Sequence, residues 1–155
     1  MGIALAALAG LIAQQPTAAP SGLARIIDGD TLELAGERVR LLGLDAPERG
    51  QSCRRDGLEW PCGEAARAAL TQFVARRALV CEGAERDRYG RLLAQCRAGT
   101  EDVGAWLVRG GWAVTFGRGG RAYRAHEAQA RLAGVGIWAG EFEPPADWRR
   151  RRRGG

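Results

Sequence analysis

Two hydrophobic periodicities alternate along the chain, and they predict two kinds of secondary structure. Five short stretches either alternate apolar with polar residues or are apolar between turn residues, as strands commonly are. These stretches are residues 24–27, 31–34, 38–44, 78–81 and 92–96. Asp28-Gly29-Asp30 predicts a tight turn between the first two, and residues 87–90 predict one between the last two. Five strands suffice for a small barrel.

Three further stretches repeat apolar residues at intervals of three and four, which predicts helices. They are residues 64–77, 100–109 and 121–132. Thr100 is expected to cap the second helix, and Gly110-Gly111 and Gly134 to end the second and third. A chain of 155 residues has the size of one domain. We therefore predict one α+β domain, mainly β, with a five-stranded barrel and three helices.

The two ends of the chain differ in composition from its centre. Residues 3–13 form an apolar run that is too short to span a bilayer and is typical of a secretory signal, although no positive region precedes it. We predict a signal-like segment and linker at residues 1–22, a folded domain at 23–140 and an Arg-rich disordered tail at 141–155. Whether the first segment is cleaved or retained as a membrane anchor is left open.

All 23 basic residues are arginine, and the net charge of +5 equals the five consecutive arginines at 149–153. The other 18 arginines balance 18 acidic residues, so the body of the chain is neutral. Because like charges repel, the arginine run predicts disorder. It also predicts a sequence-independent contact with nucleic acid or anionic lipid. The absence of lysine is by itself typical of GC-rich coding.

Four cysteines predict two disulfides. Cys81 and Cys96 lie symmetrically about the turn between the last two predicted strands, so they face each other across a hairpin. Cys53 and Cys62 flank a short polar loop and form the second pair. Zinc is disfavoured because no C-x-x-C spacing exists and the only histidine is His126. Two disulfides indicate an oxidising compartment, so we expect a secreted or periplasmic protein.

Acidic residues and arginines gather in three short motifs. Asp30 lies in Ile-Asp-Gly-Asp-Thr, Arg40, Asp45 and Glu48 lie within the nine-residue segment 40–48, and Arg91 ends Asp-Arg-Tyr-Gly-Arg. The three carboxylates are suitable ligands for a hard cation, and paired arginines bind phosphate bidentately and stabilise its transition-state charge. Each residue alone is also typical of a turn or a strand end. Together they predict a phosphodiesterase site.

The order of these motifs resembles the staphylococcal nuclease (thermonuclease) family. The similarity continues through Leu-Val-Arg-Gly-Gly-Trp and Gly-Ile-Trp and covers roughly residues 24–138. The resemblance implies a five-stranded OB-fold barrel with three helices. It also implies calcium-dependent cleavage of DNA and RNA that leaves 3′-phosphate ends.

The resemblance further assigns roles to individual residues. It implies calcium ligands at Asp30, Asp45 and the carbonyl of Ala46, catalytic residues at Arg40, Glu48 and Arg91, and substrate-binding residues at Arg88, Tyr89 and Phe116. Three of these positions depart from the family pattern. Ala46 replaces a threonine, Arg88 replaces a lysine, and Phe116 stands near a usual tyrosine, so it can stack on a base but cannot hydrogen-bond to it.

The alternative to an enzyme is an OB-fold module that binds single-stranded nucleic acid without cutting it. All five charged positions of the predicted site are present, which favours the enzyme. A structural or adhesive protein acting through its arginine tail would leave these five charges unexplained. The expected partner is single-stranded DNA or RNA, no obligate protein partner is evident, and membrane contact is expected only through the N-terminal segment or the tail.

Overall fold

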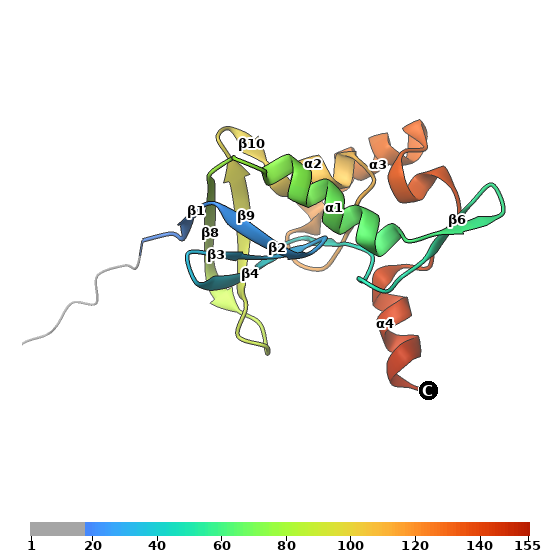
Figure 1. The fold of residues 1–155 in the computed structure, drawn as a ribbon, viewed down its shortest axis with the longest axis horizontal. Helices are drawn as coiled ribbons and strands as arrows, with labels where there is room; N and C mark the ends of the chain where they lie inside the picture. Colours follow the sequence, from blue (N-terminus) through green and yellow to red (C-terminus); the bar gives the residue numbers. More distant parts are fainter. Residues whose placement is uncertain (1–17) are drawn as a thin grey trace, which may run out of the picture.

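Seven strands form one mixed sheet in the computed structural model, which describes residues 18–155 (Figure 1). The order is β1-β8-β9-β4-β3-β2, with β10 paired to β9; β4 and β9 run parallel and the other neighbours antiparallel. The strands are β1 (Ser21–Gly22), β2 (Ala24–Asp28), β3 (Thr31–Leu34), β4 (Glu37–Leu41), β8 (Leu79–Arg86), β9 (Leu92–Ala98) and β10 (Glu101–Asp102).

Strands β1 and β2 follow each other in the sequence but lie at opposite edges of this sheet. Only Leu23 separates β1, which pairs with β8, from β2, which pairs with β3. Within residues 18–155 no ladder joins β2 directly to β8, so the barrel is not closed by hydrogen bonds, and its two edges are linked only through the chain at Leu23. The five predicted strands and the mainly β, α+β OB-fold class are confirmed.

The predicted strand at residues 38–44 is shorter than expected. β4 ends at Leu41 because Gly43 adopts a φ of 87°, which reverses the chain and places its Cα against Gly119. The following residues form β5 (Leu44–Asp45), which pairs with β11 (Val114–Thr115). A separate hairpin consists of β6 (Cys53–Arg55) and β7 (Leu58–Trp60). The turn at Gly43 therefore separates Arg40 on one strand from Asp45 on another.

The three predicted helices are present with shifted ends. They are α1 (Cys62–Val74), α2 (Val103–Arg109) and α3 (Arg124–Ala133); one 3₁₀ turn (Gly120–Tyr123) precedes α3 and another (Gly136–Ala139) follows it. The cap predicted at Thr100 is wrong, because the carboxylate of Asp102 accepts the hydrogen bond from the N–H of Ala105 (3.0 Å). The predicted end of the first helix at Arg77 is also wrong, since Arg76 adopts a φ of 62°.

The tail predicted to be disordered is instead a helix, α4 (Pro145–Arg153), which projects below the barrel in Figure 1. Proline at the first helical position favours helix formation, and the arginines of the last turn interact favourably with the helix dipole. Ion pairs with nearby carboxylates offset the repulsion between these arginines: Arg150 pairs with Asp147, and Arg151 pairs with Glu143 at 2.9 Å. The expectation of disorder was therefore wrong.

The main core lies between the sheet and helices α1 and α2. Leu32, Leu34 and Val39 are fully buried on the sheet, and Leu70 and Leu107 meet them from the two helices. The rings of Phe73 and Trp106 stack at 4.1 Å between the helices. A second, smaller cluster surrounds the disulfide between Cys53 and Cys62. It contains these two cysteines and Ile137, with Trp60, Val114, Trp138 and Phe142 packed against them. No helix within residues 18–155 is both long and apolar enough to cross a membrane.

Both predicted disulfides are present. Cys81 and Cys96 face each other in the β8–β9 register with a Cα separation of 4.1 Å, and Cys53 and Cys62 are bonded with a Cα separation of 5.6 Å. All four cysteines of the chain are thus paired. The predicted signal-like run at residues 3–13 lies outside the described residues.

We expect loss of the Cys81–Cys96 bond to lower stability substantially. The bond closes a 15-residue separation, for which the chain-entropy estimate is about 3 kcal/mol. Differential scanning calorimetry of Cys81→Ala/Cys96→Ala should therefore show a melting temperature about 10 °C lower. Cys53→Ala/Cys62→Ala protein, measured before and after reduction with dithiothreitol, loses only the Cys81–Cys96 cross-link and keeps its sulfur atoms, which separates loss of the cross-link from loss of sulfur packing. An unchanged melting temperature in both samples would contradict the prediction.

Candidate active site

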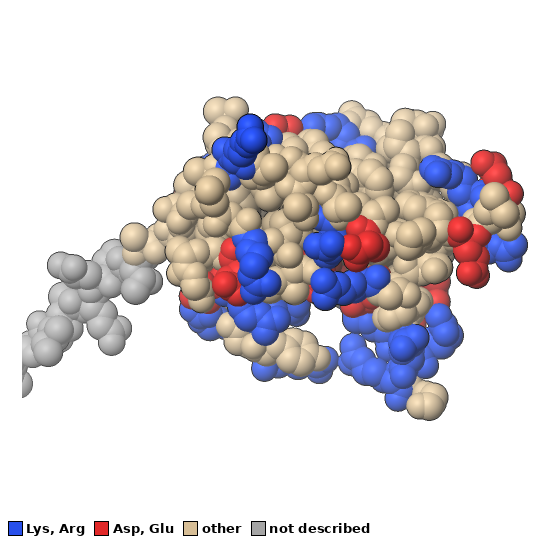
Figure 2. Space-filling view, viewed as in Figure 1, with Lys and Arg blue, Asp and Glu red and all other residues tan. Residues whose placement is uncertain are grey.

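The three charged motifs converge on one cavity of about 740 Å³ between the β8–β9 hairpin and α4. Its polar lining includes Asp28, Asp30, Arg40, Glu48, Asp87, Arg88, Tyr89, Arg91, Arg118, Arg149 and Arg153. Figure 2 shows basic side chains on both sides of this opening, over the hairpin and over α4. The predicted catalytic arginines and Glu48 therefore share one site, although they come from separate elements.

Asp30 is held in a turn that packs tightly on its neighbours. A Cβ on the preceding Gly29 would lie 2.8 Å from the Cβ of Ala46, so only glycine lets this turn approach so closely. The Oδ2 of Asp30 accepts a hydrogen bond from the N–H of Ala46 (2.9 Å), and Oδ1 accepts one from the hydroxyl of Thr31 (3.0 Å). The predicted ligands Asp30 and Ala46 are thus neighbours in space.

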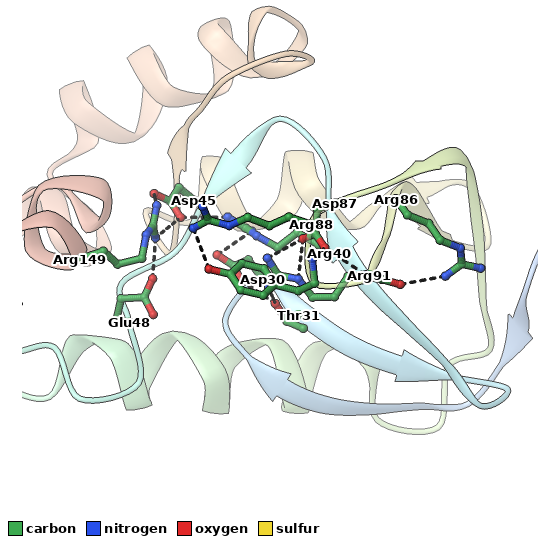
Figure 3. Close-up of polar contacts among 12 residues, drawn as sticks. Asp30, Thr31, Arg40, Asp45, Glu48, Arg86, Asp87, Arg88, Arg91 and Arg149 are labelled. Atoms are coloured by element: carbon green, nitrogen blue, oxygen red, sulfur yellow. Dashed lines mark hydrogen bonds and ion pairs between the residues drawn. The ribbon is translucent and has the colours of Figure 1, made fainter. Parts of the chain in front are cut away.

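Arg40 connects Asp30 to Asp45 (Figure 3). Its Nη2 donates to Oδ1 of Asp45 (3.0 Å), while Nη1 lies 2.8 Å from Oδ2 of Asp30 without hydrogen-bond alignment. Asp45 is fully buried on β5, and this burial raises the pKa of its carboxyl against the opposing effect of its hydrogen bonds with Arg149. The two carboxylates therefore face one guanidinium in a largely desolvated site.

Arg91 is oriented by Asp87 at the tip of the β8–β9 hairpin. Its Nε donates to Oδ2 of Asp87 (2.7 Å), and its Nη1 donates to the hydroxyl of Thr31 (3.3 Å). Oδ1 of Asp87 accepts from the backbone N–H groups of Tyr89 and Arg91. Burial would raise the pKa of Asp87, but the hydrogen bonds from Arg91 and Tyr89 outweigh it and lower the pKa. Arg91 is thereby fixed as a charged donor beside the cavity.

The predicted substrate-binding residues are more exposed than the charged centre. Tyr89 is 62% exposed, and its hydroxyl accepts a hydrogen bond from Arg88 (2.7 Å). Phe116 is 46% exposed, and its backbone N–H donates to the carbonyl of Gly43 (3.0 Å). Both aromatic rings line the cavity and are accessible to a base.

Glu48 lies at the edge of the cavity on the loop between β5 and β6. Its backbone N–H donates to the side chain of Gln51 (3.1 Å), and a Cβ on Gly63 would meet its carbonyl oxygen at only 1.7 Å. The first turn of α1 therefore supports this loop closely. The carboxylate of Glu48 remains about one third exposed (32%) and accepts a hydrogen bond from Nη1 of Arg149 at 2.5 Å.

Arg149 of α4 is a site residue that the sequence prediction missed. Its Nη1 and Nη2 donate to Oδ1 and Oδ2 of Asp45, both at 2.9 Å, in addition to the contact with Glu48. The hydrogen bond with Asp45 is the main cause that raises the pKa of Arg149, so the guanidinium stays charged. The only sequence signal was the arginine run itself, which suggested a polyanion partner and not an internal carboxylate.

The oxygen donors of the site have the chemistry of a hard-cation site, but arginines now contact them. Asp30, Asp45 and the carbonyl of Ala46 are the oxygen ligands that calcium prefers. Among residues 18–155, however, no three His, Cys, Asp or Glu side chains are arranged to hold a metal ion. Arg40 and Arg149 contact the carboxylates instead. The donor set therefore fits a cation only if the Asp45 oxygens are released by Arg149.

Comparison with known proteins agrees with this arrangement. A family model described as staphylococcal nuclease homologue matches residues 38–140. The chain is 43% identical over 126 residues to the succinoglycan biosynthesis protein ExoI of Rhizobium meliloti (strain 1021), covering 79% of this chain and 66% of that protein. It is 35% identical over 167 aligned positions to protein ParB of Escherichia coli, and this alignment covers 95% of this chain and 89% of that protein.

A relative with a nuclease name is the micrococcal nuclease of Shigella flexneri. It is 31% identical over 144 residues, which cover 81% of this chain and 78% of that protein. The segment matched by the family model contains Arg40, Asp45, Glu48 and Arg91. Arg149 and the whole of α4 follow that segment.

Proposed function

The chain belongs to the staphylococcal nuclease homologue family, and we propose that it is a calcium-dependent endonuclease that cleaves DNA or RNA to leave 3′-phosphate ends. The convergence of Arg40 from β4 and Arg91 from the turn before β9 in one cavity, beside Asp30 and Glu48 and with the buried Asp45 in contact with Arg40, supports this proposal best. Neither arginine would need this placement in a module that only binds. Nuclease relatives support a nucleic acid substrate.

Asp30, Asp45 and the carbonyl of Ala46 would hold the cation, which when bound supplies Lewis-acid polarisation of a phosphate oxygen. Their oxygens are hard ligands, and the desolvation of Asp45 strengthens every charge interaction there. Asp30 and the Ala46 segment are already tied by a 2.9 Å hydrogen bond. The protein thereby preorganises two of the three groups before any cation is present.

Arg40 and Arg91 would bind the two equatorial oxygens of the scissile phosphate. Nη1 of Arg40 is buried, lies 2.8 Å from Oδ2 of Asp30 and has no aligned hydrogen-bond acceptor among the described residues, so it would turn toward the cavity to donate to a phosphate oxygen. Arg91 is fixed by Asp87, whose Oδ2 lies 2.7 Å from both Nε and Nη2, while Nη1 makes a longer contact of 3.3 Å with the hydroxyl of Thr31, which a phosphate oxygen would replace. As negative charge develops on the phosphate these donors bind more strongly, which lowers the barrier and not only the dissociation constant.

Glu48 would orient the attacking water and accept its proton. Its carboxylate lies at the cavity edge, is partly exposed, and therefore has access to water. Attack forms a bond from the water oxygen to phosphorus and breaks the bond from phosphorus to the 5′ oxygen, which leaves a 3′-phosphate. A partly solvated carboxylate is a weak base, so positioning contributes much of its effect.

The nucleic acid would cross the cavity between the hairpin tip and α4. The exposed rings of Tyr89 and Phe116 can stack on unpaired bases, which favours a single strand over a duplex. Arg88, Arg118 and Arg153 line the same opening and can bind flanking phosphates. Phosphate contacts of this kind do not depend on sequence.

Digestion of single-stranded DNA and RNA in calcium, or in excess chelator, tests the proposal. We expect cleavage in calcium, none in chelator, and products with 3′-phosphate and 5′-hydroxyl ends by end-group labelling. Arg40→Ala protein, purified identically, controls for contaminating nucleases. Full cleavage in chelator would overturn the calcium requirement, and binding without cleavage in calcium would favour the single-strand binding module.

We also propose that the protein works outside the cytoplasm. The two disulfides support this compartment, because such bonds persist in oxidising environments. Alkylation and mass spectrometry of non-reduced protein from its native host should reveal no free thiol. Four free thiols would instead place the protein in a reducing compartment.

A further inference from the structure

The guanidinium of Arg149 contacts the carboxylates of Asp45 and Glu48 and lies on the oxygens of Asp45 that a bound cation would use. It bonds both oxygens of Asp45, which is completely buried, and one oxygen of Glu48, all within 2.9 Å. No other guanidinium of α4 reaches these acids. Because the guanidinium donates to both oxygens of this buried carboxylate, it occupies the lone pairs that a metal ion would need.

The attachment of α4 to the rest of the protein depends on this side chain. Among the described residues, Arg149 makes the ion pairs that join α4 to the domain before it, whereas Arg150 and Arg151 pair with Asp147 and Glu143 of the same terminal segment. At the base of the helix, Gln51 donates to the carbonyl of Glu143 (2.7 Å). The segment just before the helix is thus anchored by Gln51, and the helix is held over the site by one arginine.

The charges at the site indicate what could replace Arg149. The carboxylates of Asp30, Asp45 and Glu48 face the guanidiniums of Arg40 and Arg149, which leaves one uncompensated negative charge. Withdrawal of Arg149 would leave two negative charges. Because buried charge without compensation is costly, the site without Arg149 is suited to a divalent cation.

We propose that Arg149 and the divalent cation compete for Asp45, so that cation binding releases Arg149, and with it α4, from Asp45 and Glu48. The inference rests on the cation site of the proposed function. Without the cation, Arg149 keeps the carboxylates paired and the nuclease inactive. With the cation, the freed Arg149 joins Arg153 at the cavity wall, where both can bind phosphates of the substrate.

Calorimetric titration of calcium, without nucleic acid, tests the competition directly. Arg149→Met keeps the apolar stem and removes the charge, and it should bind calcium at least about tenfold more tightly if the closed arrangement is populated nine times in ten. Arg149→Gln is a second variant, circular dichroism checks that both fold, and Arg152→Ala, an exposed arginine on the same helix, is the matched control. Calcium affinity in Arg149→Met and Arg149→Gln that equals or falls below wild type would overturn the proposal.

Hydrogen exchange of the α4 amides provides a readout independent of affinity. Calcium should speed exchange over residues 146–153 in the wild type, whereas Arg149→Met should exchange rapidly with or without calcium. Exchange unaffected by calcium in a protein that binds it would overturn release of the helix. If neither wild type nor variants bind calcium, the cation site of the proposed function fails and the competition fails with it; if all bind equally, only the competition fails.

Discussion

Arg40→Lys is expected to lower turnover by at least about a hundredfold, the effect of losing one preorganised donor to a transition-state oxyanion. The fork of Arg40 spans two carboxylates, with Nη1 2.8 Å from Asp30 and Nη2 3.0 Å from Asp45. Lysine keeps the charge but has one nitrogen, so it cannot contact both acids and also donate to phosphate. Single-turnover cleavage of a labelled oligonucleotide in saturating calcium measures the chemical step.

Two matched variants make this result specific. Arg38→Lys changes an exposed arginine on the same strand and should leave turnover unchanged. Arg91→Lys loses the hydrogen bonds from Nε to Asp87 and from Nη1 to Thr31. The turnover of this variant should therefore also fall by at least about a hundredfold. A wild-type rate in either active-site variant would remove that arginine from the mechanism.

The convergence of the charged motifs was predictable because each motif is local and stands where a strand begins or ends. Asp30 follows a turn that its own glycine permits, and Arg91 ends a hairpin whose register the Cys81–Cys96 pair already predicted. These features depend on turn chemistry and strand alternation, which sequence expresses directly. The mainly β, α+β class and the places of the five long strands were predicted correctly for the same reason, although the strand predicted at residues 38–44 ends at Leu41.

The role of Arg149 was not predictable, because its partners are far away in sequence. Asp45 lies 104 positions before it, and no local pattern connects the two. The arginine run suggested repulsion and disorder, whereas nearby acids and the Pro144-Pro145 start allow a helix. The cap predicted at Thr100 was wrong for a similar reason. Thr100 and Asp102 lie close together in the sequence, and pairing of Glu101–Asp102 with β9 places Asp102 at the start of the helix.

Glu48→Gln is expected to slow turnover by about a hundredfold, near the lower limit for loss of a general base. The amide has the same shape and still accepts a hydrogen bond from Arg149, which contacts the carboxylate at 2.5 Å. It cannot take a proton from water, so kcat should fall while KM changes little. Steady-state kinetics on single-stranded DNA measure both constants, and Glu59→Gln, an exposed acid on β7, is the control.

The contact between Glu48 and Arg149 means that calcium concentration decides how this variant is interpreted. If Glu48 acts on water, kcat of the variant stays low at saturating calcium. If Glu48 serves mainly to hold Arg149 over the site, the amide weakens that hold, and half-maximal activity is reached at a lower calcium concentration with kcat unchanged. A normal kcat at saturating calcium would therefore remove Glu48 from the chemical step and leave it as part of the α4 attachment.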